Sequence, residues 1–267
     1  MRFDVHADVG DWAFRRLPMS GVDGVLAVMR RHGIAAAVVG PVEGILYRNP
    51  EGANALLFER LAQAESSACL LPAAVINPVF PGWQRDLETA GRRGARAVKL
   101  YPNYHGYDAG GGPAQELARA AAALGLPLIC CVRVEDERQH HWHLLMPPVQ
   151  AERVAALAKA VPEAKIVLAC GNQREIEVFL AATPADRCWA ELSYLKSPSN
   201  SVEQMVSKVG APRLLFGTHL PFLDPGVTTV KVERSGVPEE ALTAILSGNA
   251  LALWPELTDA AACAPPG

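Results

Sequence analysis

Short apolar runs alternate with segments of helical character along almost the whole chain. Most of the runs are apolar on both faces, as in the strands of a parallel sheet that helices cover on both sides. This alternation predicts an α/β protein and leaves few other folds open. The predicted strands are Arg2–His6, Ile34–Val39, Leu71–Ile76, Ala95–Tyr101, Leu128–Val134, Ile166–Cys170, Trp189–Leu192 and Leu214–Gly217.

The segments between the predicted strands carry signals for the start and end of helices. Pro113 suits a first helical turn, and Gly125 is expected to end the same helix. Ser201 is a candidate N-cap within a capping box. The last helix is expected to start at Pro238 and to end at Gly248.

Eight strand–helix units in 267 residues predict a single-domain (β/α)8 TIM barrel. We expect the barrel to span residues 1–259, and the small, Pro-rich segment 260–267 to be a flexible C-terminal tail. A doubly wound sheet is the alternative. It is less favoured because no Gly-x-Gly-x-x-Gly motif follows the first predicted strand, where a dinucleotide-binding fold would carry it.

Charge and hydropathy exclude several classes of partner. The net charge is −3 and no basic tract is present, so we expect no nucleic-acid partner. Two uncharged stretches, 66–84 and 120–132, are interrupted by Pro or Gly and do not predict a membrane span. Without an apolar signal core near the N-terminus, we expect a cytoplasmic protein with reduced cysteines and a small-molecule substrate. The sequence leaves open whether the chain forms a homo-oligomer.

In a barrel of this kind the chemistry lies at the C-terminal ends of the strands, so reactive side chains there are site candidates. His6 and Asp8 are two residues apart on the first strand and therefore face the same side. An imidazole and a carboxylate on one face can share a metal ion or a water molecule. The alternative is an isolated histidine at the barrel mouth and an unrelated loop aspartate.

The fourth strand and the loop after it add candidates for substrate binding. Lys99 and Tyr101 share one face, and a lysine inside a barrel must meet an acid, a substrate or water. The following loop contains aromatic residues together with Asn103 and His105, a composition that suits a substrate wall. An ordinary surface loop is the alternative interpretation.

Later strands end in further reactive side chains. Arg133 follows the fifth strand and can bind a substrate carboxylate through two parallel hydrogen bonds. An internal salt bridge of Arg133 with Glu135 or Asp136 is the alternative. His219 follows the eighth strand, and closure of the barrel would place it beside the first strand; a buried core histidine is the other interpretation.

Four segments, in this order and at these spacings, together resemble the amidohydrolase-related (amidohydrolase 2) family of metal-dependent (β/α)8 hydrolases and decarboxylases. The resemblance covers nearly the whole chain and implies a barrel fold with a divalent metal ion at its mouth. The segments are residues 4–8 (Asp-Val-His-Ala-Asp), 94–104, 215–222 (Leu-Phe-Gly-Thr-His-Leu-Pro-Phe) and 245–254.

The chain departs from the family pattern at the metal site that this resemblance implies. Family members usually carry His-x-His on strand one, one His each on strands five and six, and an Asp on strand eight. The residues at these places are His6 and Asp8 on strand one, Cys131 or Cys130 on strand five, Cys170 on strand six and His219 on strand eight.

Three hypotheses follow from the altered ligand set. The first, which we favour at this point, is a metal-free hydrolase of a small carboxylated or cyclic substrate such as a lactone or an amide. His219 is then the general base and is supported by Asp8 and His6, while Lys99 and Arg133 bind negative charge.

The second hypothesis is a zinc-dependent hydrolase or decarboxylase with a rewired ligand set of His6, Asp8, Cys170 and His219. The cofactor is accordingly none or one divalent ion. The third is a catalytically inactive barrel that binds a ligand. Elemental analysis of protein purified without chelator separates the first two hypotheses.

Overall fold

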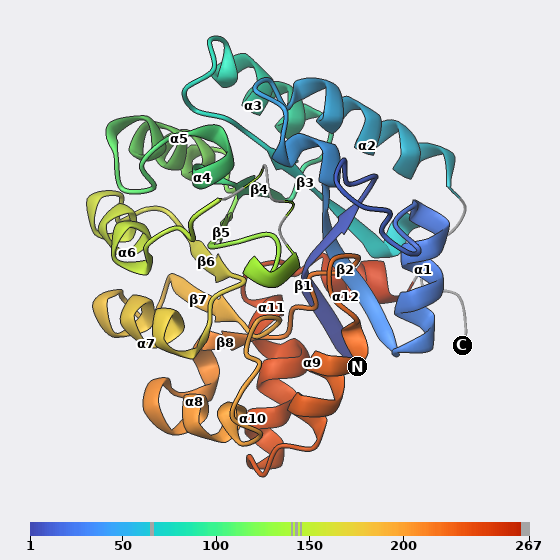
Figure 1. Ribbon diagram of the computed structural model, residues 1–267, viewed down its shortest axis with the longest axis vertical. Helices are drawn as coiled ribbons and strands as arrows, with labels where there is room; N and C mark the ends of the chain where they lie inside the picture. The colour runs from blue at the N-terminus through green and yellow to red at the C-terminus, as the bar shows by residue number, and fades with distance from the viewer. Residues whose placement is uncertain (65–66, 140, 142–143, 145, 263–267) are drawn as a thin grey trace.

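The eight predicted strands form one sheet in chain order, from β1 to β8, and each strand pairs in parallel with the next. The sheet curls into a nearly closed barrel that helices surround (Figure 1). This computed structural model describes residues 1–64, 67–139, 141, 144 and 146–262. The strands are β1 Arg2–Val9, β2 Ile34–Pro41, β3 Leu70–Val75, β4 Ala97–Leu100, β5 Leu128–Cys131, β6 Ile166–Ala169, β7 Cys188–Glu191 and β8 Leu214–Leu215.

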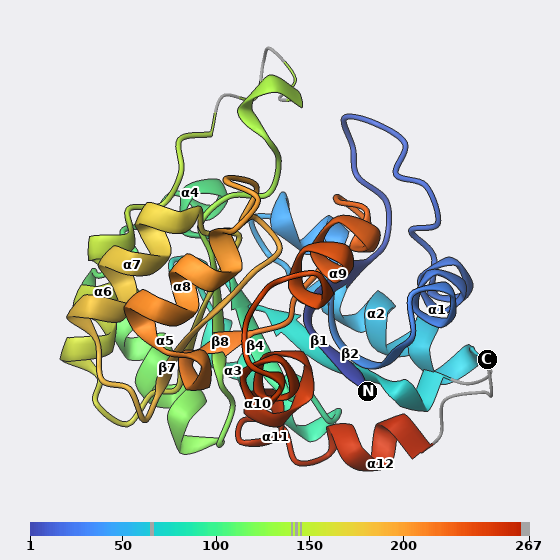
Figure 2. The ribbon, with the colours of Figure 1, turned by 90° about the horizontal axis from the view of Figure 1, so that it is seen from below.

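Helices follow the strands and form the outer layer of the barrel (Figures 1 and 2). Within the described residues, none is both long enough and apolar enough to cross a membrane. The helices are α1 Val22–Arg31, α2 Glu51–Gln63, α3 Trp83–Arg92, α4 Pro102–His105, α5 Gly112–Ala123, α6 Ala151–Ala160, α7 Gln173–Ala182, α8 Ser201–Val209, α9 Pro225–Glu233, α10 Glu239–Thr243, α11 Asn249–Leu251 and α12 Leu257–Ala262.

The strands are apolar on both faces because both faces are buried. Every residue of β4, β5, β6 and β7 lies in the interior. One face of each strand packs inside the barrel and the other packs against the helices. Each fully buried Val, Leu or Ile contributes about 1.5–3 kcal/mol relative to an exposed one, so this double burial drives the folding of the short strands.

Contacts between β1 and the segment after β8 close the barrel. The regular part of β8 has only two residues, so most of the closure lies beyond it. The His219 N–H donates to the His6 carbonyl at 2.7 Å, and the Asp8 N–H donates to the Leu220 carbonyl at 2.6 Å. These bonds place the first and last strands of the chain side by side.

The Asp4 carboxylate strengthens this closure from inside the barrel. It accepts hydrogen bonds from the His6 N–H and the Thr218 N–H, both at 3.0 Å, and from the Thr218 hydroxyl. Asp4 is completely buried, and burial raises its pKa to about 7. The Asp4 side chain therefore holds the backbone of His6 and of Thr218, the residue before His219.

Two of the predicted helix boundaries are wrong. Ser201 is the first helical residue of α8 rather than its N-cap, and Asn200 occupies the cap position without a side-chain cap bond. Gly248 does not end the last helix, because it has helical dihedral angles and the chain continues from a π-helical turn, Ala244–Gly248, into α11. The starts predicted at Pro113 and Pro238 agree with α5 and α10.

The predicted flexible tail begins too early. Residues 260–262 belong to α12, and Ala260 is buried because it packs with the apolar core. The remaining tail residues, 263–267, lie outside the described part of the chain.

We expect Asp4→Ala to lower the free energy of unfolding by about 3 kcal/mol, because the substitution leaves three buried donors on His6 and Thr218 without an acceptor. Urea denaturation followed by circular dichroism measures the change. Asp186→Ala, at a carboxylate that is 78% exposed, is the matched control and should leave stability unchanged. Equal stability of the two variants would contradict the role of Asp4 in closure.

Candidate active site

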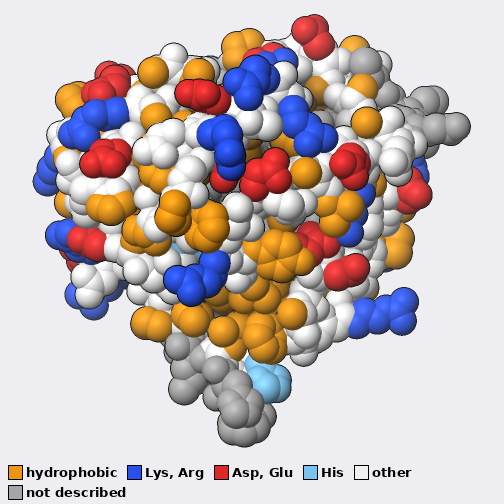
Figure 3. Space-filling model, turned by 90° about the horizontal axis from the view of Figure 1, so that it is seen from above, with side chains coloured by type: hydrophobic (Ala, Val, Ile, Leu, Met, Phe, Trp, Pro, Cys, Tyr) orange, Lys and Arg blue, Asp and Glu red, His pale blue; other side chains and the backbone are white. Residues whose placement is uncertain are grey.

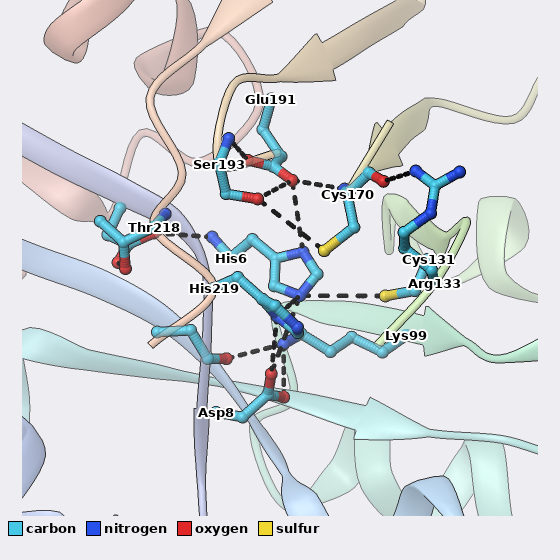
Figure 4. A network of polar contacts seen from close by, with 12 residues as sticks. His6, Asp8, Lys99, Cys131, Arg133, Cys170, Glu191, Ser193, Thr218 and His219 are labelled. Atoms are coloured by element: carbon cyan, nitrogen blue, oxygen red, sulfur yellow. Dashed lines mark hydrogen bonds and ion pairs between the residues drawn. The ribbon is translucent and has the colours of Figure 1, made fainter. Parts of the chain in front are cut away.

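Six reactive side chains converge inside the barrel mouth from β1, β4, β5 and the ends of β6 and β8 (Figure 4). Each is at most 1% exposed, so their interactions take place in a region of low dielectric constant. The structure thus brings together five of the predicted site residues and one residue from strand five. The six are His6, Asp8, Lys99, Cys131, Cys170 and His219.

His6 and His219 face each other at the centre of this group. His219 Nε2 lies 2.6 Å from the Val134 carbonyl oxygen, which can only accept, so Nε2 carries the proton. His219 Nδ1 lies 3.1 Å from His6 Nε2. Burial lowers the pKa of His219 to about 3 and the pKa of His6 well below its usual value, so both rings are neutral.

Three of the four predicted metal ligands lie close enough to hold one ion. The ligand atoms of His6, Cys170 and His219 are all within 4.8 Å of one another. Two imidazole nitrogens bound tetrahedrally to one zinc ion lie about 3.4 Å apart, close to the 3.1 Å between His6 Nε2 and His219 Nδ1. Two imidazoles and a thiol are also donors that zinc prefers.

Asp8 lies beside these three residues and has one unused oxygen. Its Oδ2 is buried without a hydrogen-bond partner, 3.7 Å from His6 Nε2 and 3.8 Å from His219 Nδ1. A buried carboxylate oxygen without a donor is costly, and a nearby cation or a water molecule would satisfy it. The donor set and this oxygen therefore fit a divalent ion such as zinc.

Lys99 holds the other oxygen of Asp8. Its Nζ donates to Asp8 Oδ1 and to the Ala7 carbonyl, both at 2.6 Å. Burial raises the pKa of Asp8 to about 6, while Lys99 opposes the increase. The lysine crosses the barrel close to Gly40 of β2, where a Cβ would lie 2.7 Å from Lys99 Cδ. Glycine at position 40 therefore makes room for the Asp8–Lys99 ion pair.

The backbone is strained at two of the site residues. Cys170 and His219 both have a φ of 55°, in the left-handed region that non-glycine residues rarely adopt. Among the described residues Met19 is the other non-glycine example. Such a conformation costs on the order of 1–2 kcal/mol for a residue with a Cβ, and strain of this kind is concentrated at functional sites.

Glu191 lies behind His6, on the side away from His219 (Figure 4). Its carboxylate accepts the Cys170 N–H at 2.5 Å, the Ser193 N–H at 2.6 Å and the Ser193 hydroxyl at 2.8 Å. Its Oε1 lies 3.9 Å from His6 Nδ1, and burial raises its pKa. Glu191 therefore contacts two of the three candidate ligands.

Arg133 forms an internal salt bridge, but its partner is neither Glu135 nor Asp136. Its guanidinium pairs with both oxygens of Glu175 at the start of α7 and donates to the Cys170 carbonyl at 2.6 Å. Glu135 instead pairs with Arg15 at 2.8 Å. The contact of Arg133 with a substrate carboxylate stays a prediction.

Of the other predicted substrate-binding residues, only Tyr101 reaches the central group. Its hydroxyl donates to Asp8 Oδ1 at 3.4 Å. Asn103 lies on the short helix α4, where a loop was predicted, and donates to the Pro147 carbonyl at 3.0 Å. His105 lies 3.1 Å from the Gly44 carbonyl, and burial lowers its pKa to about 4. Their roles in substrate binding stay predictions.

An aromatic layer covers the histidine pair. Phe222 stacks on His219 with the ring centres 4.8 Å apart, and Trp12 contacts both Phe222 and Tyr104. The loop after β1 and the described residues 132–139 after β5 rise above this end of the barrel (Figure 2). Hydrophobic side chains also gather on the surface toward this end (Figure 3). The layer separates the buried polar group from bulk water.

Comparison with known families identifies the class of protein. The family model described as Amidohydrolase matches residues 4–255, and the chain belongs to this family. The chain is therefore an enzyme of the amidohydrolase superfamily with a TIM-barrel fold. No curated protein matches the sequence significantly.

Solved structures share the fold at low sequence identity. A 2,6-dihydroxybenzoate decarboxylase from Rhizobium has a TM-score of 0.72 at 14% identity, over 94% of this chain and 98% of its own. A dihydroxybenzoic acid decarboxylase from Polaromonas with bound manganese has a TM-score of 0.72 at 16% identity, over 94% and 96%. A protein from Acinetobacter baumannii described as a probable 2-pyrone-4,6-dicarboxylic acid hydrolase has a TM-score of 0.67 at 13% identity, over 94% and 98%.

Three acidic residues hold the site residues in place but were not predicted from the sequence: Asp4, Glu191 and Glu175. Two of these carried a usable signal. Asp4 shares the inward-facing alternation of His6 and Asp8, and Glu191 is the charged residue that ends an apolar strand. Glu175 had no such signal, because it lies on a helix and reaches Arg133 only in the folded chain.

We expect Cys170→Ala to reduce the affinity for zinc by at least about 100-fold, since loss of a single outer-shell partner already costs about 10–100-fold. Competition with a chromophoric chelator measures the affinity. Cys130→Ala is the matched control, because Cys130 is equally buried but does not belong to the group that could hold an ion. Equal zinc affinity in both variants would show that Cys170 is not a ligand.

Proposed function

We propose that the protein is a zinc-dependent hydrolase of a small carboxylated or cyclic substrate, such as a lactone or an amide. The observation that carries this proposal is the unpartnered Asp8 Oδ2, which lies within 3.8 Å of both candidate imidazole ligands. A carboxylate oxygen at this position is placed to take a proton from water bound beside His6, Cys170 and His219.

The contacts of His219 do not suit the general base of the metal-free hypothesis. Its Nε2 proton is held by the Val134 carbonyl, and its Nδ1 faces His6 Nε2 at 3.1 Å. Asp8 is 3.8 Å from His219 Nδ1, too far for the hydrogen bond that would orient the ring. We therefore assign His219 to metal binding and the role of general base to Asp8.

The residues around the site have separate roles in this proposal. His6, Cys170 and His219 would hold the zinc ion, which would supply positive charge to acidify water and to stabilise a developing oxyanion. Asp8 Oδ2 accepts the proton of the attacking water and then gives it to the leaving oxygen or nitrogen. Lys99 holds Asp8 Oδ1 and favours the ionised carboxylate. The aromatic layer of Trp12, Tyr104 and Phe222 excludes bulk water.

Decarboxylation of an aromatic acid is the second candidate. The aromatic layer above the site suits a flat ring, and two of the structures that share the fold are dihydroxybenzoate decarboxylases. In this reaction Asp8 would act in the opposite sense and deliver a proton to the ring carbon that loses carbon dioxide. The same residue is therefore central to both candidates, and the substrate distinguishes them.

We expect Asp8→Asn to lower kcat/KM by at least about 100-fold while zinc binding persists, because general acid–base catalysis typically contributes 10²–10⁴-fold. The assay is a panel of lactones, amides and hydroxybenzoates with zinc-loaded protein, and elemental analysis confirms the zinc. Asp11→Asn, at an exposed carboxylate three residues further along the same segment, is the control. Undiminished activity of Asp8→Asn would exclude Asp8 as the base, and release of carbon dioxide without hydrolysis would favour the decarboxylase.

A further inference from the structure

The second nitrogen of His6 has no partner. His6 Nδ1 is buried and makes no hydrogen bond, and Glu191 Oε1 faces it at 3.9 Å (Figure 4). This distance is too long for a hydrogen bond. A buried imidazole nitrogen that faces a carboxylate without bonding to it requires an explanation, because a proton on that nitrogen would give a strong, charge-assisted bond.

The hydrogen bonds of the two imidazole rings explain why His6 Nδ1 and Glu191 Oε1 are 3.9 Å apart. The Val134 carbonyl fixes the His219 proton on Nε2, which leaves Nδ1 of His219 as an acceptor. His6 Nε2, at 3.1 Å from that acceptor, must then be the donor. With its proton on Nε2, His6 presents a bare Nδ1 to Glu191, and two acceptors that face each other stay apart.

The position of Glu191 is fixed by other contacts. Both carboxylate oxygens accept hydrogen bonds from Ser193, and Oε1 also accepts the N–H of Cys170. The chain after β8 passes so close that a Cβ on Gly217 would lie 2.5 Å from Glu191 Oε2. Glycine at 217 therefore lets the carboxylate remain in the space behind His6.

We propose that Glu191 is a positioning residue for the metal site, which holds Cys170 in its left-handed turn and accepts a hydrogen bond from His6 Nδ1 when His6 Nε2 binds the ion. This inference rests on the zinc site of the proposed function and adds the residue that orients its ligands. The His6 ring stays neutral in this change, because its one imidazole proton leaves Nε2 and ends on Nδ1. A carboxylate behind a metal-bound histidine fixes the tautomer and the ring orientation.

The test replaces Glu191 and reads the metal site directly. We expect Glu191→Gln to weaken zinc binding by about 10–100-fold and to change the visible and thiolate charge-transfer bands of the cobalt(II)-loaded protein. Glu135→Gln is the matched control, since Glu135 is a buried glutamate at the same end of the barrel that pairs with Arg15 instead. Unchanged zinc affinity and an unchanged cobalt spectrum in Glu191→Gln would overturn the proposal.

A measurement on the unaltered protein covers the case in which Glu191→Gln does not fold. In zinc-loaded protein labelled with ¹⁵N, we expect His6 to carry its proton on Nδ1, and that proton to exchange slowly with solvent. His219 should keep its proton on Nε2. A His6 ring that keeps its proton on Nε2, or that binds zinc through Nδ1, would overturn the proposal.

These measurements need no substrate, so they separate this inference from the proposed function. A protein that binds zinc as described but hydrolyses nothing in the panel would refute the hydrolase and leave the role of Glu191 intact. A protein that hydrolyses a lactone and binds zinc, while Glu191→Gln leaves both the affinity and the cobalt spectrum unchanged, would refute only the role of Glu191. Wild-type protein that binds neither zinc nor cobalt would overturn both.

Discussion

The junction between β1 and the segment after β8 is the constraint on which the site depends. Asp4 accepts both donors of Thr218, and the backbone of His219 bonds to that of His6, so residues 213 positions apart become neighbours. The short regular part of β8 would give little closure by itself. Because the same contacts close the barrel and bring the imidazoles to 3.1 Å, stability and site geometry are coupled at this junction.

Buried charge around the site is compensated almost everywhere. Asp4 and Glu191 are satisfied by N–H and hydroxyl donors, and Arg133 is satisfied by Glu175. In Asp8 one oxygen is tied to Lys99 and the other has no partner. A carboxylate oxygen without a partner is costly in a region of low dielectric constant, so a cation or a water molecule beside Asp8 Oδ2 would be bound favourably. This contrast is why the proposed chemistry centres on Asp8.

The two-residue spacing of His6 and Asp8 predicted that their side chains share one face of strand one. The structure agrees, since both are buried and His6 Nε2 lies 3.7 Å from Asp8 Oδ2. Closure of the predicted barrel placed His219 beside the first strand, which the 3.1 Å contact with His6 confirms. The salt-bridge partners considered for Arg133, Glu135 and Asp136, were wrong. They are the acids nearest to Arg133 along the chain, whereas its actual partner, Glu175, lies on α7 and is brought near only by folding. The N-cap predicted at Ser201 and the helix end predicted at Gly248 were also wrong, because tertiary packing overrides the intrinsic preference of a residue for a capping position.

The sequence by itself determined the strand–helix alternation, the family resemblance and the face that His6 and Asp8 share, because apolar periodicity and short motifs are local properties of the chain. The tertiary structure alone decided which nitrogen of each histidine is protonated, which oxygen of Asp8 is unused and that Glu191 faces His6. These features depend on side-chain rotations and on partners from distant strands. No local pattern encodes them, because each is fixed only when the ring of strands closes.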